Sequence, residues 1–220
     1  MSKHLEREFE QLKKDILSLG ARVEEAVHQS VKSISLRDAK LAQKVIDGDL
    51  AIDQREVEIE EDCLKVLALH QPVAIDLRFI VAVMKINNDL ERIADLAVNI
   101  AERTVSLSQK PPLTASFDFP TMAGKVESML RLCLDALVQT DPSRARQVLT
   151  ADDEIDVIHR QMYDLVQSAI LDQPSEINGL IQMLSVSRYL ERIADHATNI
   201  AEDVIYLVQG EIVRHRSEQT

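Results

Sequence analysis

The sequence is poor in the residues that turn-rich folds depend on. Its 220 residues include only five glycines, six prolines and no tryptophan, and aromatic residues make up 3% of the chain. Sandwiches and barrels use more turn and aromatic residues than this. The 45% hydrophobic content is nevertheless sufficient for a substantial core. The composition therefore predicts an all-α fold.

Basic residues are also scarce relative to acidic ones. There are 25 lysines and arginines against 37 acids, a net charge of -12. This excess repels phosphate backbones and anionic headgroups, so no nucleic acid is expected as a direct ligand. The two cysteines, Cys63 and Cys133, lie in helical patterns and are expected to fill core space in a reducing compartment.

Long apolar segments are missing as well. The opening MSKHLEREFEQ has no apolar stretch of the kind found in secretory signals. The longest uncharged run, residues 177–187, is shorter than the roughly 18 apolar residues that a membrane span needs. We therefore expect a cytoplasmic protein that reaches a membrane only through partners.

What the sequence does have is helical periodicity over most of its length. The stretch KPPLTASFDFP contains three prolines and no apolar periodicity, so it predicts a linker at 110–120 between two antiparallel three-helix bundles, 1–109 and 121–220. Six long helices are predicted, over residues 4–34, 38–70, 73–108, 120–139, 142–172 and 175–210.

Two phrases recur in both halves. LERIADLAVNIAE at 90–102 returns as LERIADHATNIAE at 190–202, and VIDGDLAID at 45–53 corresponds to VLTADDEID at 148–156. Such self-similarity indicates one structural unit used twice. The two bundles are therefore predicted to be pseudo-repeats that hold the same side chains in place.

Acidic residues four apart are the most conspicuous content of these phrases. Each half offers Asp-x-x-x-Asp on its second helix and Glu-x-x-x-Asp on its third, which places each pair on one edge of a helix. Facing pairs of carboxylates can chelate a hard cation, with iron, manganese or magnesium favoured over zinc. The predicted metal ligands are Asp49, Asp53, Glu91, Asp95, Asp152, Asp156, Glu191 and Asp195.

Two plainer interpretations of these acids stay open. They can form a solvated acidic face, or Arg92 and Arg192 can neutralise them. Each arginine is roughly 100 degrees around the helix from the neighbouring glutamate, so we expect it to contact another helix or solvent instead. Glycine-rich phosphate loops and the usual nucleophile motifs are absent from the sequence, so no enzymatic activity is expected.

With ALHQPVAIDLRFI at 68–80 followed by two LERIAD phrases, the chain closely resembles the PhoU family over nearly its whole length. The family pattern Pro-x-Ala-x-Asp-Leu-Arg is met at 72–78, whereas Ala94 and Ala194 replace the usual glycine of each phrase. The resemblance implies paired three-helix bundles, often dimeric, with metal on the eight acids named above.

The resemblance also implies a function. Members of the family restrain phosphate-starvation signalling by linking the high-affinity phosphate transporter, through its ATPase subunit, to a sensor histidine kinase. A metal-binding or storage bundle, or an accessory subunit of a low-affinity phosphate transporter, stays open as an alternative.

Overall fold

The structure is a computed structural model, and it describes residues 3–115, 118–211 and 213. Within these residues the chain forms six α-helices and one short 3-10 turn, with no β-strand. The elements are α1 Lys3–Leu36, α2 Ala39–His70, α3 Ile75–Ser108, α4 Phe119–Gln139, α5 Pro142–Asp172, η1 Pro174–Glu176 and α6 Ile177–Gln209. The predicted all-α class and the six helices are confirmed, with ends that differ by no more than two residues.

Helix ends follow from identifiable capping residues. Asp38 precedes α2 and accepts hydrogen bonds from the backbone N–H groups of Lys40 and Leu41, and Asp141 caps α5 in the same way through Ser143 and Arg144. At the C-terminal ends of α2 and α4, Gln71 and Thr140 adopt the left-handed conformation that terminates a helix. These caps explain why the chain turns where its periodicity breaks.

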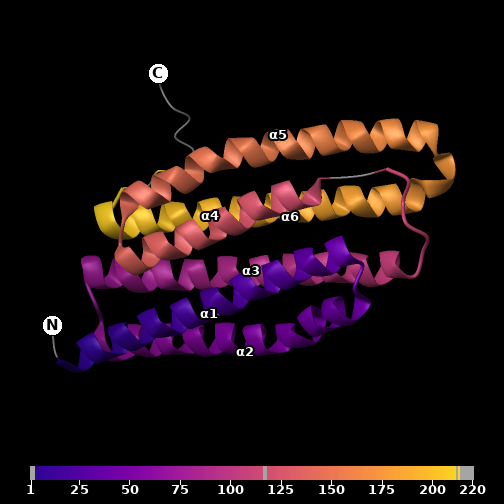
Figure 1. Ribbon diagram of the computed structural model, residues 1–220. Coiled ribbons are helices and arrows are strands. Elements are labelled where there is room, and N and C mark those ends of the chain that lie inside the picture. The colour runs from indigo at the N-terminus through magenta and orange to yellow at the C-terminus, as the bar shows by residue number, and fades with distance from the viewer. Residues whose placement is uncertain (1–2, 116–117, 212, 214–220) are drawn as a thin grey trace, which may run out of the picture.

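The helices form two antiparallel three-helix bundles lying side by side (Figure 1). Helices α1, α2 and α3 pack on one another, and so do α4, α5 and α6. The bundles meet through α3 against α6 and α1 against α4, which leaves α2 and α5 on opposite outer sides. Within the described residues, no helix is both long and apolar enough to cross a membrane.

One hydrophobic core runs through both bundles. Fully buried leucines and isoleucines of α3 and α6, such as Leu90 and Ile193, lie at its centre. Ala94 and Ala194 are also buried, so the methyl groups that replace the family glycine are part of the core packing. The acidic positions of each LERIAD phrase are thereby held at the edge of the core.

The connector between the bundles is docked on both of them. Thr114 donates to the Glu176 carboxylate through its backbone N–H at 3.0 Å and through its hydroxyl at 2.6 Å. Arg37 donates to the carbonyl groups of Leu107 and Lys110. The described residues 110–115 of the connector are therefore docked on the bundles and do not form a free tether.

We predict that Asp38→Ala and Asp141→Ala each destabilise the protein by about 1 kcal/mol, because each removes a cap that satisfies two helix N–H groups. For a chain of this length, the corresponding fall in Tm is about 2 to 4 °C per variant. Calorimetry of both variants measures it, and Asp47→Ala, an exposed mid-helix change on α2, is the control. Equal melting of the cap variants and the control would contradict this account of the helix starts.

Candidate metal centres

The first candidate site lies along the seam between α2 and α3. Asp49 and Asp53 come from α2, and Glu91 and Asp95 come from α3. Asp49 feels the charges of both Asp53 and Asp95, and Glu91 feels those of Asp95 and Asp53. The structure thus brings the four predicted acids of the first half into one electrostatic cluster.

The second candidate site repeats this arrangement between α5 and α6. Asp152 interacts most strongly with Asp195 and Asp156 and also feels Glu191. Glu191 in turn feels Asp195 and Asp156. All eight predicted residues therefore lie in two groups of four, one in each bundle.

Burial and mutual repulsion make five of these eight carboxylates harder to ionise. Burial, reinforced by the neighbouring aspartates, raises the pKa of Asp49 and that of Asp152 from 3.8 to about 6. Burial is also the largest cause of the raised pKa values of Glu91, Glu191 and Asp195, with like charges adding to it. Groups held together at this cost favour a cation between them.

A buried oxygen in the first cluster also fits a cation. Asp49 Oδ1 has no hydrogen-bond partner among the described residues, whereas the buried Glu91 Oε2 faces Arg92 Nε at 3.4 Å. Unpaired buried carboxylate oxygens are costly, and hard cations take such oxygens as ligands. The donor set therefore suits an oxygen-coordinated metal ion.

The present side-chain positions do not enclose an ion. Among the described residues, no three His, Cys, Asp or Glu side chains form a group that could hold a metal. The acids of each cluster lie near one another without converging on a single point. Binding of an ion would require their side chains to rotate inward, and the ligand set stays a prediction.

Arg92 departs from expectation. Its guanidinium lies 3.4 Å from a Glu91 oxygen and 3.4 Å from an Asp95 oxygen, although its helix position points away from their stripe. The expectation that it contacts another helix or solvent instead of its own stripe is wrong for Arg92, because a long side chain can fold back across one turn of its own helix. Arg92 is exposed, so this contact neutralises the cluster only from its outer side.

The predicted ligand set omits a neighbouring carboxylate, Glu56. The Asn87 side chain donates to the Glu56 carboxylate and to its backbone carbonyl, both at 2.9 Å. Burial, with Glu60 and Asp53 nearby, raises the pKa of Glu56. The signal was available in the sequence, since Glu56 follows Asp49 and Asp53 on the same side of α2.

At the corresponding place in the second bundle, the chemistry changes. His159 Nδ1 lies 2.8 Å from the hydroxyl of Ser187, and burial lowers the pKa of this histidine. His159 also lines a surface cavity of about 640 Å³ together with Arg188, Glu191 and Asp195. The two clusters are therefore similar in their four acids and different in their surroundings.

Comparisons with known proteins agree with this architecture. The PhoU domain model matches residues 16–104 and 119–204. A phosphate-specific transport system accessory protein PhoU homolog from Aquifex aeolicus is 38% identical over 210 residues, which is 96% of this chain and 95% of that protein. A homolog of the same name from Clostridium acetobutylicum is 34% identical over 96% of this chain and 97% of its own length.

Solved structures give the same result. The crystal structure of PhoU from Pseudomonas aeruginosa matches with a TM-score of 0.91 and 34% identity, covering 94% of this chain and 99% of that one. The phosphate transport system regulatory protein PhoU from Streptococcus pneumoniae matches with a TM-score of 0.85 and 31% identity, covering 95% and 99%.

We predict that the metal-free protein becomes more stable as the pH falls from about 7.5 to about 5.5. The folded-state pKa of Asp49 and Asp152, about 6, exceeds the ordinary value of 3.8, so the folded state binds more protons between these values. Their stabilising contribution is complete below about 3.8 and is lost as the pH rises through 6. Asp49→Asn with Asp152→Asn should stabilise the protein at pH 7.5 by about 1 kcal/mol per site and flatten the pH dependence.

Urea unfolding across this pH range, in chelator-treated buffer, measures the effect. Glu154→Gln is the control, because its hydrogen bond with Lys125 lowers the pKa of Glu154 and gives the opposite sign. If the double variant keeps the wild-type dependence of unfolding free energy on pH, Asp49 and Asp152 are not the cause of that dependence.

Proposed function

We propose, from the premise that this chain belongs to the PhoU family, that it is a non-enzymatic accessory protein of phosphate uptake and a repressor of the phosphate-starvation response. The observation that carries the proposal is the match of both bundles to the family model, together with relatives named as phosphate transport accessory proteins along nearly the full chain. As a second element of the proposal, the protein works in the cytoplasm as a homodimer.

The proposed partners are the ATPase subunit of the high-affinity phosphate transporter and its sensor histidine kinase. A rigid pseudo-repeated body offers two similar faces, which suits an adaptor that contacts two proteins at once. By binding the non-phosphorylating state of the kinase more tightly than the active state, it would shift the kinase toward repression in high phosphate. Its net charge of -12 favours contact with basic protein surfaces.

We propose that the metal ions serve the regulatory role of the protein and take no part in a chemical reaction. Asp49, Asp53, Glu91 and Asp95 would hold one centre, and Asp152, Asp156, Glu191 and Asp195 the other. A bound cation offsets the burial and the mutual repulsion that raise the pKa of Asp49 and that of Asp152. Iron, manganese and magnesium all match an oxygen donor set.

We predict that untagged protein, purified without chelator, contains metal that is lost from an Asp95→Asn, Asp195→Asn double variant. The two changes remove one carboxylate charge from each cluster while preserving side-chain size. Elemental analysis gives the ion content, and circular dichroism checks that the variant is folded. Equal metal content in a folded variant would exclude these acids as ligands.

For the adaptor role, we predict that purified protein retains both the transporter ATPase and the kinase in pull-downs at micromolar concentration. The binding should occur in separate and in combined assays, with and without added metal. If the protein retains neither the transporter ATPase nor the kinase under any of these conditions, the proposal is wrong. High metal content with redox turnover and no partner binding would instead favour a storage bundle.

A further inference from the structure

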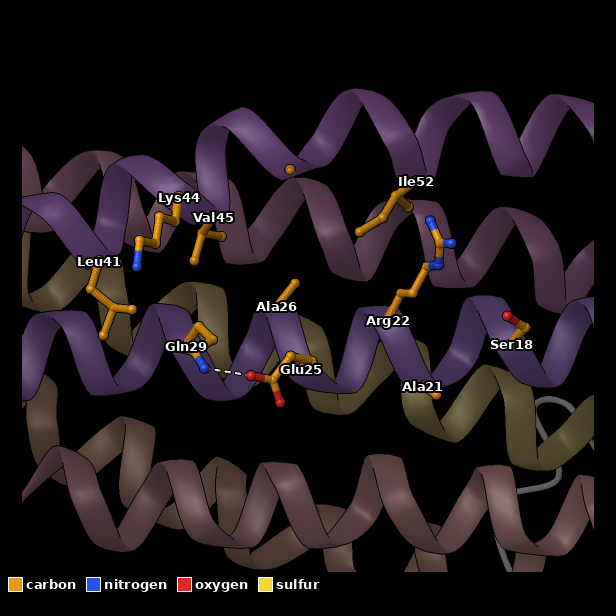
Figure 2. A pocket seen from close by; sticks show the side chains of 11 residues that line it. Ser18, Ala21, Arg22, Glu25, Ala26, Gln29, Leu41, Lys44, Val45 and Ile52 are labelled. Carbon is orange, nitrogen blue, oxygen red and sulfur yellow. Dashed lines mark hydrogen bonds between the residues drawn. The ribbon is translucent and has the colours of Figure 1, made fainter.

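A surface pocket lies in the first bundle. Its volume is about 680 Å³, and Figure 2 shows it lying between α1 and α2. It extends along residues 18–29 of α1 and 41–52 of α2, about 16 Å along each helix. No residue of the pocket belongs to the candidate metal centres.

The pocket combines an apolar floor with two cations. Ala26, Val45 and Ile52 provide apolar surface, while Arg22 reaches from α1 toward α2 and Lys44 reaches from α2 toward α1 (Figure 2). In the part of the chain that the structure describes, neither cation forms an ion pair. Two unpaired cations in a protein of net charge -12 mark a local site for acidic groups.

Gly48 leaves the α2 backbone uncovered where it lines the pocket. It lies in the interior of α2, where glycine is less favourable than alanine, and a Cβ atom added there would meet no atom within 4 Å. Glycine at this position therefore relieves no clash within the described chain. It lets a ligand approach the α2 backbone closely.

The second bundle differs from the first at positions that line the pocket. Aligning the caps Asp38 and Asp141 pairs Ala26 with the larger Met129 and Gly48 with the larger Ala151. Lys125, which stands for Arg22, is paired with Glu154 at the surface.

We infer that the α1–α2 pocket is a docking groove for one amphipathic helix of a partner protein, with acidic side chains two turns apart. A third helix laid along two antiparallel helices matches the length of the groove, and the small residues of its floor allow close packing. Arg22 and Lys44 lie at opposite ends of the groove (Figure 2). Arg22 and Gln29, both of which line the pocket on α1, are seven residues and about 10 Å apart along that helix, which is the rise between positions i and i+7.

Glu25 determines which charge a ligand can carry between the two ends of the groove. Its carboxylate already accepts a hydrogen bond from the Gln29 side chain, as Figure 2 shows. An acid on the ligand opposite Glu25 would be repelled, so the acidic positions belong at the two ends and a neutral or basic residue between them. This inference is independent of the proposed phosphate function, because it rests only on the groove.

The test uses a fluorescent, stapled helical peptide of about 15 residues with glutamates at i and i+7, leucines at i+3 and i+4, and alanines elsewhere. Anisotropy at physiological salt, where charges beyond about 8 Å are screened, measures its binding to full-length protein. We expect saturable binding that weakens about tenfold or more when both glutamates become glutamine, and likewise for Arg22→Gln with Lys44→Gln. Gly48→Leu should abolish binding without lowering Tm.

Gly124→Leu is the matched control, because Gly124 is an exposed helical glycine of the second bundle at which an added Cβ atom would also meet no atom within 4 Å. It should leave the peptide affinity unchanged. No saturable binding, or binding that Gly48→Leu leaves intact, would overturn the inference. Two further results would overturn it. Tighter binding of dodecanedioate, a small dianion, than of the peptide would identify a small anion as the occupant. Dissociation of a dimer by Gly48→Leu, seen by sedimentation, would identify a second copy of this chain as the occupant.

Discussion

The antiparallel packing of α3 on α6 is the contact on which the rest of the structure depends. Alanines such as Ala97 and Ala197 are fully buried, and they allow the two longest apolar stripes to share one core. Polar pairs fix the register of this contact, with His196 2.8 Å from Asp89 and Lys85 3.1 Å from the buried Asp203. The outer helices can then pack on each side of a central pair that is already aligned.

The same packing holds the repelling carboxylates together. In each LERIAD phrase the leucine, isoleucine and first alanine are buried, so the glutamate and aspartate beside them are fixed at the edge of the core. Their backbones cannot separate without breaking apolar contacts that are worth more than the repulsion. Burial at this edge, with the repulsion adding to it, raises the pKa of Glu91 and that of Glu191. On the neighbouring helices α2 and α5, the same two causes raise the pKa of Asp49 and that of Asp152 to about 6.

The helices and the two acidic clusters could be predicted from the sequence because both depend on spacing along one helix. Periodicity assigns a residue to a face, and the repeated phrase shows that the same faces are used twice. Periodicity could not predict contacts that depend on side-chain rotamers or on pairs of segments distant in the sequence. Arg92 folding back to Asp95, and Thr114 anchoring the connector on Glu176, are of this kind.

The groove was missed for a related reason, because it exists where small side chains on two different helices, Ala26 and Gly48, face the same space. Helical spacing says nothing about the volume left between two helices.

The two bundles are therefore equal in backbone and unequal in chemistry. In the first, Glu56 with its Asn87 partner adds a further carboxylate beside the four acids, whereas His159 with Ser187 occupies this place in the second. Arg188 and Arg192 both offset part of the burial-driven rise in the pKa of Glu191, whereas Arg92 is the one cation among the described residues that acts on Glu91 in this way. The two bundles share one backbone scaffold, and different residues at matched positions make their two clusters chemically different.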